Sequence, residues 1–75
     1  MSSVGLELPK EIERVSAKRE RYRGYAREFD AEASFSLAIG LMTHDIDAAH
    51  SAIASGDPIA ALRAYEALKG YSDDD

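Results

Sequence analysis

The chain has 75 residues, of which 45% are hydrophobic and 31% charged, and its formal net charge is −5. This composition is typical of one small globular domain and excludes a disordered chain. The absence of cysteine excludes disulfides and thiolate chemistry. With no apolar run long enough to cross a membrane and no signal-peptide pattern, we expect a cytoplasmic protein without membrane contact.

The first predicted helix covers about residues 9–28. Apolar residues recur there at intervals of three or four, a spacing that indicates one buried helical face. Pro9 suits the first turn of a helix, so residues 1–8 are expected to form a flexible N-terminus. Arg19 occupies an interior position of this face, where it either extends its charged end to solvent or pairs with a carboxylate of a second copy.

The second predicted helix covers about residues 31–55 and is apolar on two sides. One row contains Phe35, Ile39, Met42, Ile46, Ala49 and Ile53, and a second contains Leu37, Leu41, Ala48 and Ala52. A helix with two apolar sides is covered on both. The register of apolar residues shifts near Asp30, a competent N-cap, which predicts an antiparallel helical hairpin. One bent helix over residues 9–55 is the alternative.

The third predicted helix covers residues 58–69. Gly56 suits the left-handed turn after a helix, Asp57 can cap the next one, and Pro58 fits its first turn. Residues 71–75 form an acidic tail. The predicted fold is therefore all-α: a long hairpin plus a shorter third helix, in a single helical domain over residues 9–70. The short third helix should leave part of the hairpin uncovered.

The segment from Gly56 to Leu68 resembles the second helix of a tetratricopeptide repeat, in which a Gly-Asp turn precedes spaced alanine, aromatic and Ala-Leu positions. The residues that carry the resemblance are Gly56, Asp57, Ala61, Leu62, Tyr65, Ala67 and Leu68. It covers about fifteen residues in one copy, whereas this family needs about three repeats. We therefore attribute it to general helix-pair packing and transfer no function.

Positive charge is concentrated in the first helix, which holds seven of the nine basic residues. This pattern supports an alternative function, an accessory or regulatory protein that binds nucleic acid. In that case the basic side chains would contact phosphates, and Tyr22 and Tyr25 would stack on bases. The basic residues of this alternative surface are Lys10, Arg14, Lys18, Arg21, Arg23 and Arg27.

The sequence offers little for metal binding or catalysis. His44, Asp47 and His50 are spaced by three residues, so their side chains rotate progressively around the helix and no fourth ligand is evident. No glycine-rich phosphate loop is present, and no serine has an identifiable base. We expect no cofactor, no metal site and no enzymatic activity.

The predicted function is a non-enzymatic module that self-associates, as a dimer, and binds a protein partner. Its size and acidic composition resemble those of small accessory proteins of bacteria and phages, including stoichiometric inhibitors. The residues expected at the interfaces are Arg19, Tyr22, Tyr25, Leu37, Leu41, Ala48, Ala52 and Tyr71.

Overall fold

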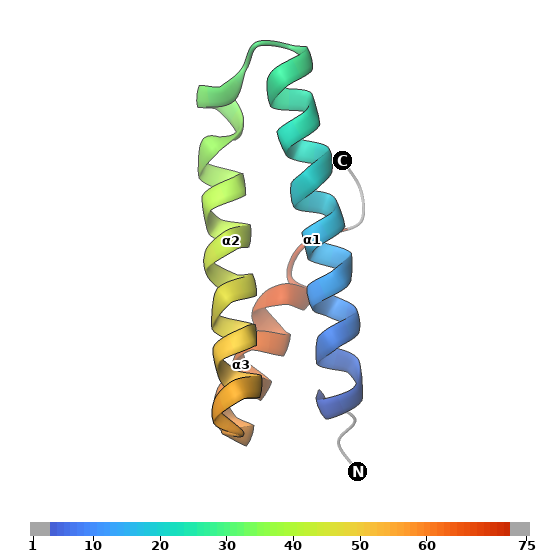
Figure 1. Ribbon diagram of the computed structural model, residues 1–75, viewed down its shortest axis with the longest axis vertical. Helices are drawn as coiled ribbons and strands as arrows, with labels where there is room; N and C mark the ends of the chain where they lie inside the picture. The colour runs from blue at the N-terminus through green and yellow to red at the C-terminus, as the bar shows by residue number, and fades with distance from the viewer. Residues whose placement is uncertain (1–3, 73–75) are drawn as a thin grey trace.

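A computed structural model describes residues 4–72 of the chain and has three helices (Figure 1). They are α1 (Val4–Glu28), α2 (Glu32–Ser55) and α3 (Pro58–Lys69). The long helices α1 and α2 run antiparallel, and α3 packs against both of them in the lower half of the hairpin. The described residues contain no strand, so the prediction of a small all-α fold is confirmed.

Helix α1 begins at Val4, five residues before the predicted start at Pro9. Residues 4–8, which were expected to be flexible, are helical, and only 1% of the Leu8 surface is exposed. Pro9 costs one backbone hydrogen bond here, the one that its N–H would have donated to the Gly5 carbonyl. Burial of Leu8 against α2 and α3 offsets this loss and extends the helix toward the N-terminus.

The turn between α1 and α2 depends on Asp30, which has a left-handed backbone with φ of 51°. The N–H of Asp30 bonds to the Arg27 carbonyl and that of Ala31 to the Ala26 carbonyl, at 3.4 and 2.9 Å. These two bonds form a Schellman motif, in which the left-handed residue is usually glycine. Asp30 therefore ends α1, whereas we had predicted that it would cap the start of α2. Ala31 precedes α2 without a side-chain cap.

The connection between α2 and α3 follows the prediction. Gly56 has φ of 68°, and its N–H bonds to the carbonyls of Ala52 and Ile53. The Asp57 carboxylate accepts hydrogen bonds from the N–H groups of Ile59 and Ala60, at 3.0 and 3.3 Å. This geometry is that of an N-cap.

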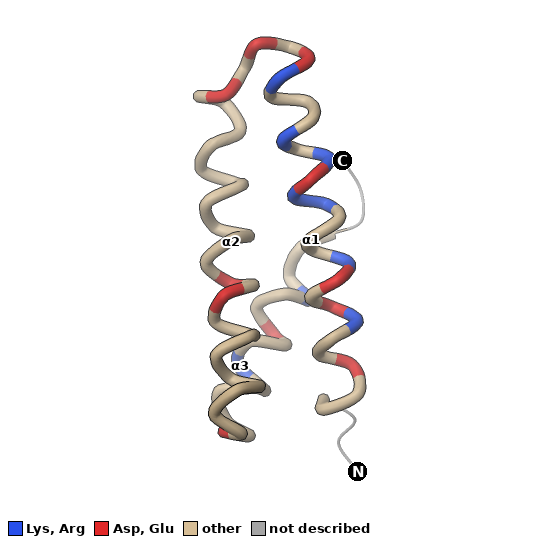
Figure 2. Tube along the Cα trace, in the orientation of Figure 1, with Lys and Arg blue, Asp and Glu red and all other residues tan. Residues whose placement is uncertain are grey.

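The hydrophobic core lies where all three helices meet. It consists of Leu8, Ile12 and Val15 of α1, Met42, Ile46 and Ala49 of α2, and Ala64 and Leu68 of α3. Figure 2 shows the contrast in charge between the long helices: basic and acidic residues alternate along α1, whereas most of α2 is uncharged. None of the helices in residues 4–72 is both long and apolar enough to cross a membrane.

Candidate functional site

The upper half of the hairpin is not covered by α3. Helix α3 has 12 residues and α2 has 24, so α3 spans about 18 Å of the roughly 36 Å length of α2. Near the C-terminal end of α3, the Tyr71 hydroxyl donates a hydrogen bond to the Asp45 carboxylate, at 2.7 Å. Asp45 therefore marks the point on α2 at which α3 stops covering the hairpin.

The second apolar row of α2 is divided at this point. Ala52, which follows Asp45 in α2, is 3% exposed and is therefore buried within a single chain. Ala48 is exposed and lines a cleft beside α3. Leu41 precedes Asp45 by four residues and Leu37 precedes Leu41 by four, so both lie on the same side of α2 beyond α3. They are 50% and 72% exposed.

An aromatic cluster lies at the upper end of the hairpin. The ring of Tyr22 meets that of Phe35 edge to face, with the ring centroids 5.5 Å apart. Tyr25 lies between Phe29 and Phe35, at centroid distances of 6.5 and 6.2 Å. Phe29 is 66% exposed. Such ring pairs hold one another in place while leaving a large apolar surface open.

These side chains lie on the side of the hairpin that α3 covers further down. In α1, Arg14 reaches α3 by donating a hydrogen bond from Nη2 to the Leu68 carbonyl, at 2.9 Å. Lys18 and Tyr22 follow Arg14 at steps of four residues and therefore share its side of α1. We call this surface the distal face; it consists of Tyr22, Tyr25, Phe29, Phe35, Leu37 and Leu41.

The six basic residues of the alternative nucleic-acid surface do not form one surface. Lys18 is 4% exposed, with its Nζ 5.0 Å from the centroid of the Tyr22 ring, and it cannot reach a phosphate without leaving the core. Arg14 is used in the contact with α3. Lys10 and Arg23 pair with glutamates of the preceding turn. Arg21 and Arg27 are exposed, but they are six residues apart and lie on different sides of α1.

Two further predicted interface residues have partners in their own chain. The Nη1 of Arg19 donates a hydrogen bond to the Thr43 hydroxyl at 3.1 Å, which links α1 to α2. Its Nε is buried and has no hydrogen-bond partner. Tyr71 is half-buried, and burial together with the hydrogen bond to Asp45 and its negative charge raises the pKa of the Tyr71 hydroxyl well above its usual value. Tyr71 thus fastens α3 to α2 rather than presenting a free ring.

His44, Asp47 and His50 are not brought together. Within residues 4–72, no group of three or more histidine, aspartate or glutamate side chains has an arrangement that could hold a metal ion. The three side chains lie on successive parts of the α2 surface, as their spacing predicts.

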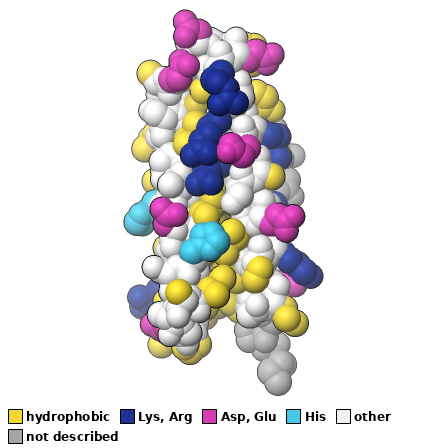
Figure 3. All heavy atoms as spheres, viewed as in Figure 1, with side chains coloured by type: hydrophobic (Ala, Val, Ile, Leu, Met, Phe, Trp, Pro, Cys, Tyr) yellow, Lys and Arg dark blue, Asp and Glu magenta, His cyan; other side chains and the backbone are white. Residues whose placement is uncertain are grey.

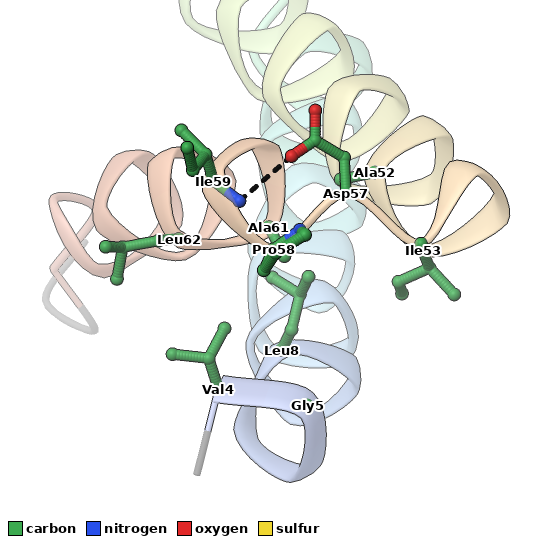
Figure 4. Close-up of a pocket in the computed structure, with 11 residues that line it drawn as sticks. Val4, Gly5, Leu8, Ala52, Ile53, Asp57, Pro58, Ile59, Ala61 and Leu62 are labelled. Atoms are coloured by element: carbon green, nitrogen blue, oxygen red, sulfur yellow. Dashed lines mark hydrogen bonds between the residues drawn. The ribbon is translucent and has the colours of Figure 1, made fainter. Parts of the chain in front are cut away.

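A second apolar surface, which the sequence reasoning missed, lies at the opposite end of the molecule. It is a groove of about 620 Å³ between the start of α1, the end of α2 and the start of α3. Figure 4 shows Leu8 of α1 pointing toward Pro58 and Ala61 of α3, with Val4 beside it. Ile59 and Leu62 are 64% and 48% exposed. The spacing of four residues between Val4 and Leu8 was the signal for this groove, because it continues the α1 seam past Pro9.

Comparison of the chain with protein-family models, with curated proteins and with solved structures finds no match.

Proposed function

We propose that this chain is a non-enzymatic interaction module that self-associates through its distal face, as a dimer, and binds a further protein. The observation that carries the proposal is the exposure of large apolar side chains on the half of the hairpin that α3 does not cover. Leu37, Phe29 and Leu41 keep at least half of their surface exposed in a single copy. Large exposed apolar side chains gathered in one part of a molecule are typical of protein-binding sites.

The small size of the chain supports self-association. A chain of this length buries only about 60% of its unfolded surface, less than larger domains do, and its core lies mainly in the half spanned by α3. Covering the distal face would add the burial that the upper half lacks. Each CH₂ group removed from water contributes about 0.8 kcal/mol, so burial of these leucine and aromatic side chains would favour association.

A second copy fits the distal face in length. If two copies pack antiparallel about a two-fold axis, the distal face of each covers that of the other. Because α3 spans about half of α2, the C-terminal end of α3 in each copy would then meet the tip of the partner's hairpin, where α1 and α2 are connected. Two-fold contacts of this isologous kind are the commonest in soluble oligomers. The upper half of each hairpin would thereby become part of a four-helix bundle.

Sedimentation equilibrium over a wide range of protein concentrations tests the proposal. We expect the wild-type chain to be a dimer and Leu37→Glu to be a folded monomer, because a charge in the centre of the interface is costly to bury. The matched control is Ile59→Glu, which alters a similarly exposed side chain in the groove at the other end. It should leave the dimer intact. A wild-type monomer at all concentrations, or a dimer broken only by Ile59→Glu, would contradict the proposed role of the distal face.

A further inference from the structure

A groove between α1 and α2 combines arginine side chains with small residues. Arg23 and Arg27 line it on the α1 side, Glu32, Ser36 and Gly40 line it on the α2 side, and its volume is about 360 Å³. Arg19 precedes Arg23 by four residues and therefore belongs to the same row of α1. Figure 3 shows Lys and Arg side chains as a continuous column in the upper half of the molecule. We call this site the arginine groove.

The arginine groove is turned away from the distal face. Ser36 and Gly40 each precede a leucine of the distal face by one residue, which corresponds to a rotation of about 100° around α2. Arg23 likewise follows Tyr22 by one residue in α1, with a rotation of similar size. The two surfaces can therefore be occupied at the same time.

Among residues 4–72, the positive charge of the groove is only partly neutralised, by Glu32, which lines the groove, and by Glu20, which pairs with Arg23. Arg23 pairs with Glu20 at 2.8 Å, but the Arg23 side chain is partly exposed and that of Glu20 is exposed, so a competing carboxylate can displace Glu20 at little cost. Arg27 is exposed and forms no ion pair among residues 4–72. Arg19 is held in place by its hydrogen bond to Thr43, with the buried Nε left unpaired. The row of Arg19, Arg23 and Arg27 thus combines one guanidinium group that is held in place, that of Arg19, with two that can bind a partner.

Close packing within residues 4–72 does not require a glycine at position 40. A Cβ atom added to it would meet nothing within 4 Å, although glycine in the interior of a helix is destabilising relative to alanine. Glycine allows another backbone to approach closely. Ser36, one turn before Gly40, is also small, and the buried Ala26 and half-buried Ile39 add an apolar floor. These features favour a packed helix over a flexible ligand.

We propose that the arginine groove binds an acidic amphipathic helix of a partner protein. Carboxylates four residues apart on such a helix are about 6 Å apart along its axis, the same step as that between Arg19, Arg23 and Arg27. Small or apolar residues of the partner would lie on the floor next to Gly40. This inference deepens the proposed binding of a further protein and does not depend on self-association. A nucleic-acid strand is disfavoured because the tyrosines that could stack on bases lie on the distal face.

The test uses a fluorescein-labelled, alanine- and leucine-based helical peptide with three glutamates at four-residue intervals. Fluorescence anisotropy measures its binding at low and high salt. We expect saturable binding that Arg27→Glu weakens about tenfold, because the variant places like charges opposite each other. Lys10→Glu makes the same change of charge outside the groove and should weaken binding far less. Equal effects of the two variants would overturn the proposal, since they would indicate general attraction to a basic helix.

Two glycine variants separate helix packing from charge attraction. Gly40→Leu should abolish peptide binding by filling the groove, whereas Gly24→Leu, at another open position of the hairpin, should not. Circular dichroism would verify that both variants are folded. A labelled single-stranded DNA that binds more tightly than the peptide, and that Arg27→Glu but not Gly40→Leu weakens, would overturn the proposal in favour of nucleic acid. The monomeric Leu37→Glu variant should still bind the peptide, so failure of self-association and failure of this inference are distinguishable.

Discussion

The Tyr71 hydroxyl donates a hydrogen bond of 2.7 Å to the carboxylate of Asp45, which fastens the chain just after α3 to the middle of α2. This contact closes the three-helix half of the molecule and marks the beginning of the uncovered half. Arg14 makes the corresponding contact from α1, through the Leu68 carbonyl. The end of α3 is therefore held from both long helices by polar groups rather than by apolar packing alone.

Tyr71→Phe should lower the free energy of unfolding by about 1 kcal/mol at neutral pH, because a hydrogen bond to a charged acceptor is lost at a partly buried position. The contribution of the hydroxyl should depend on pH. Because the folded chain raises the Tyr71 pKa, this contribution is fully present below about pH 10, the ordinary tyrosine value, and is lost as the pH rises further. Urea denaturation of both proteins between neutral and alkaline pH measures the difference. A difference unchanged above pH 10 would contradict the effect of Asp45.

Arg14→Met should lower the free energy of unfolding by about 1–2 kcal/mol, because the Leu68 carbonyl at the end of α3 loses a charged donor and the half-buried ion pair with Glu11 is lost as well. The aliphatic part of the side chain is kept, so packing changes little. Lys10→Met is the control, since it removes only an exposed pair with Glu7 and should change stability by less than about 0.5 kcal/mol. Similar losses for both variants in chemical denaturation would show that the contact with Leu68 is unimportant.

Leu8→Ala should destabilise the fold by about 2–5 kcal/mol, the usual cost of removing a buried leucine side chain. Leu6, two residues earlier, is 76% exposed, and Leu6→Ala should have little effect. Thermal or chemical denaturation of the two variants compares the two sides of the first turns of α1. Equal stability of the two variants would mean that the helix is not fixed to the core before Pro9.

Asp30→Gly should stabilise the chain by about 0.5–1 kcal/mol. Asp30 has a positive φ, which costs a residue with a Cβ atom more than it costs glycine, and part of the gain is offset by the greater freedom of glycine in the unfolded chain. Asp30→Ala should be less stable than Asp30→Gly. The order of the midpoints in urea denaturation tests this, and a more stable alanine variant would contradict the left-handed backbone.

Gly56→Ala is the opposite substitution at the other connection. It should destabilise the chain by about 1–2 kcal/mol, because alanine would have to adopt the left-handed backbone conformation of Gly56, with φ of 68°, which a residue with a Cβ atom disfavours. No atom outside the local backbone obstructs the added methyl group, so the cost arises from the backbone alone. A neutral effect on the free energy of unfolding would indicate that α2 can end in another way.

The candidate surfaces were predictable in part. The sequence placed Leu37 and Leu41 on a second apolar side of α2, and they are exposed as a set. It also placed Ala52 in that set, although α3 covers it. Lys18 was assigned to a solvated basic surface, and it is buried. For Ala52 and Lys18 the spacing gave the correct direction of the side chain around its helix. The error concerned which other helix or side chain packs against it at that position along the helix axis.

The sequence alone determined the helical class, the three segments and the second connection, because apolar spacing and the Gly56-Asp57-Pro58 motif act locally. Only the tertiary structure decided where α3 ends on the hairpin, and with it which half stays uncovered. It also decided that Asp30 takes the left-handed position and that Leu8 extends α1 past Pro9. These features depend on contacts between residues distant in the chain, whose energies exceed local preferences and leave no periodic signal in the sequence.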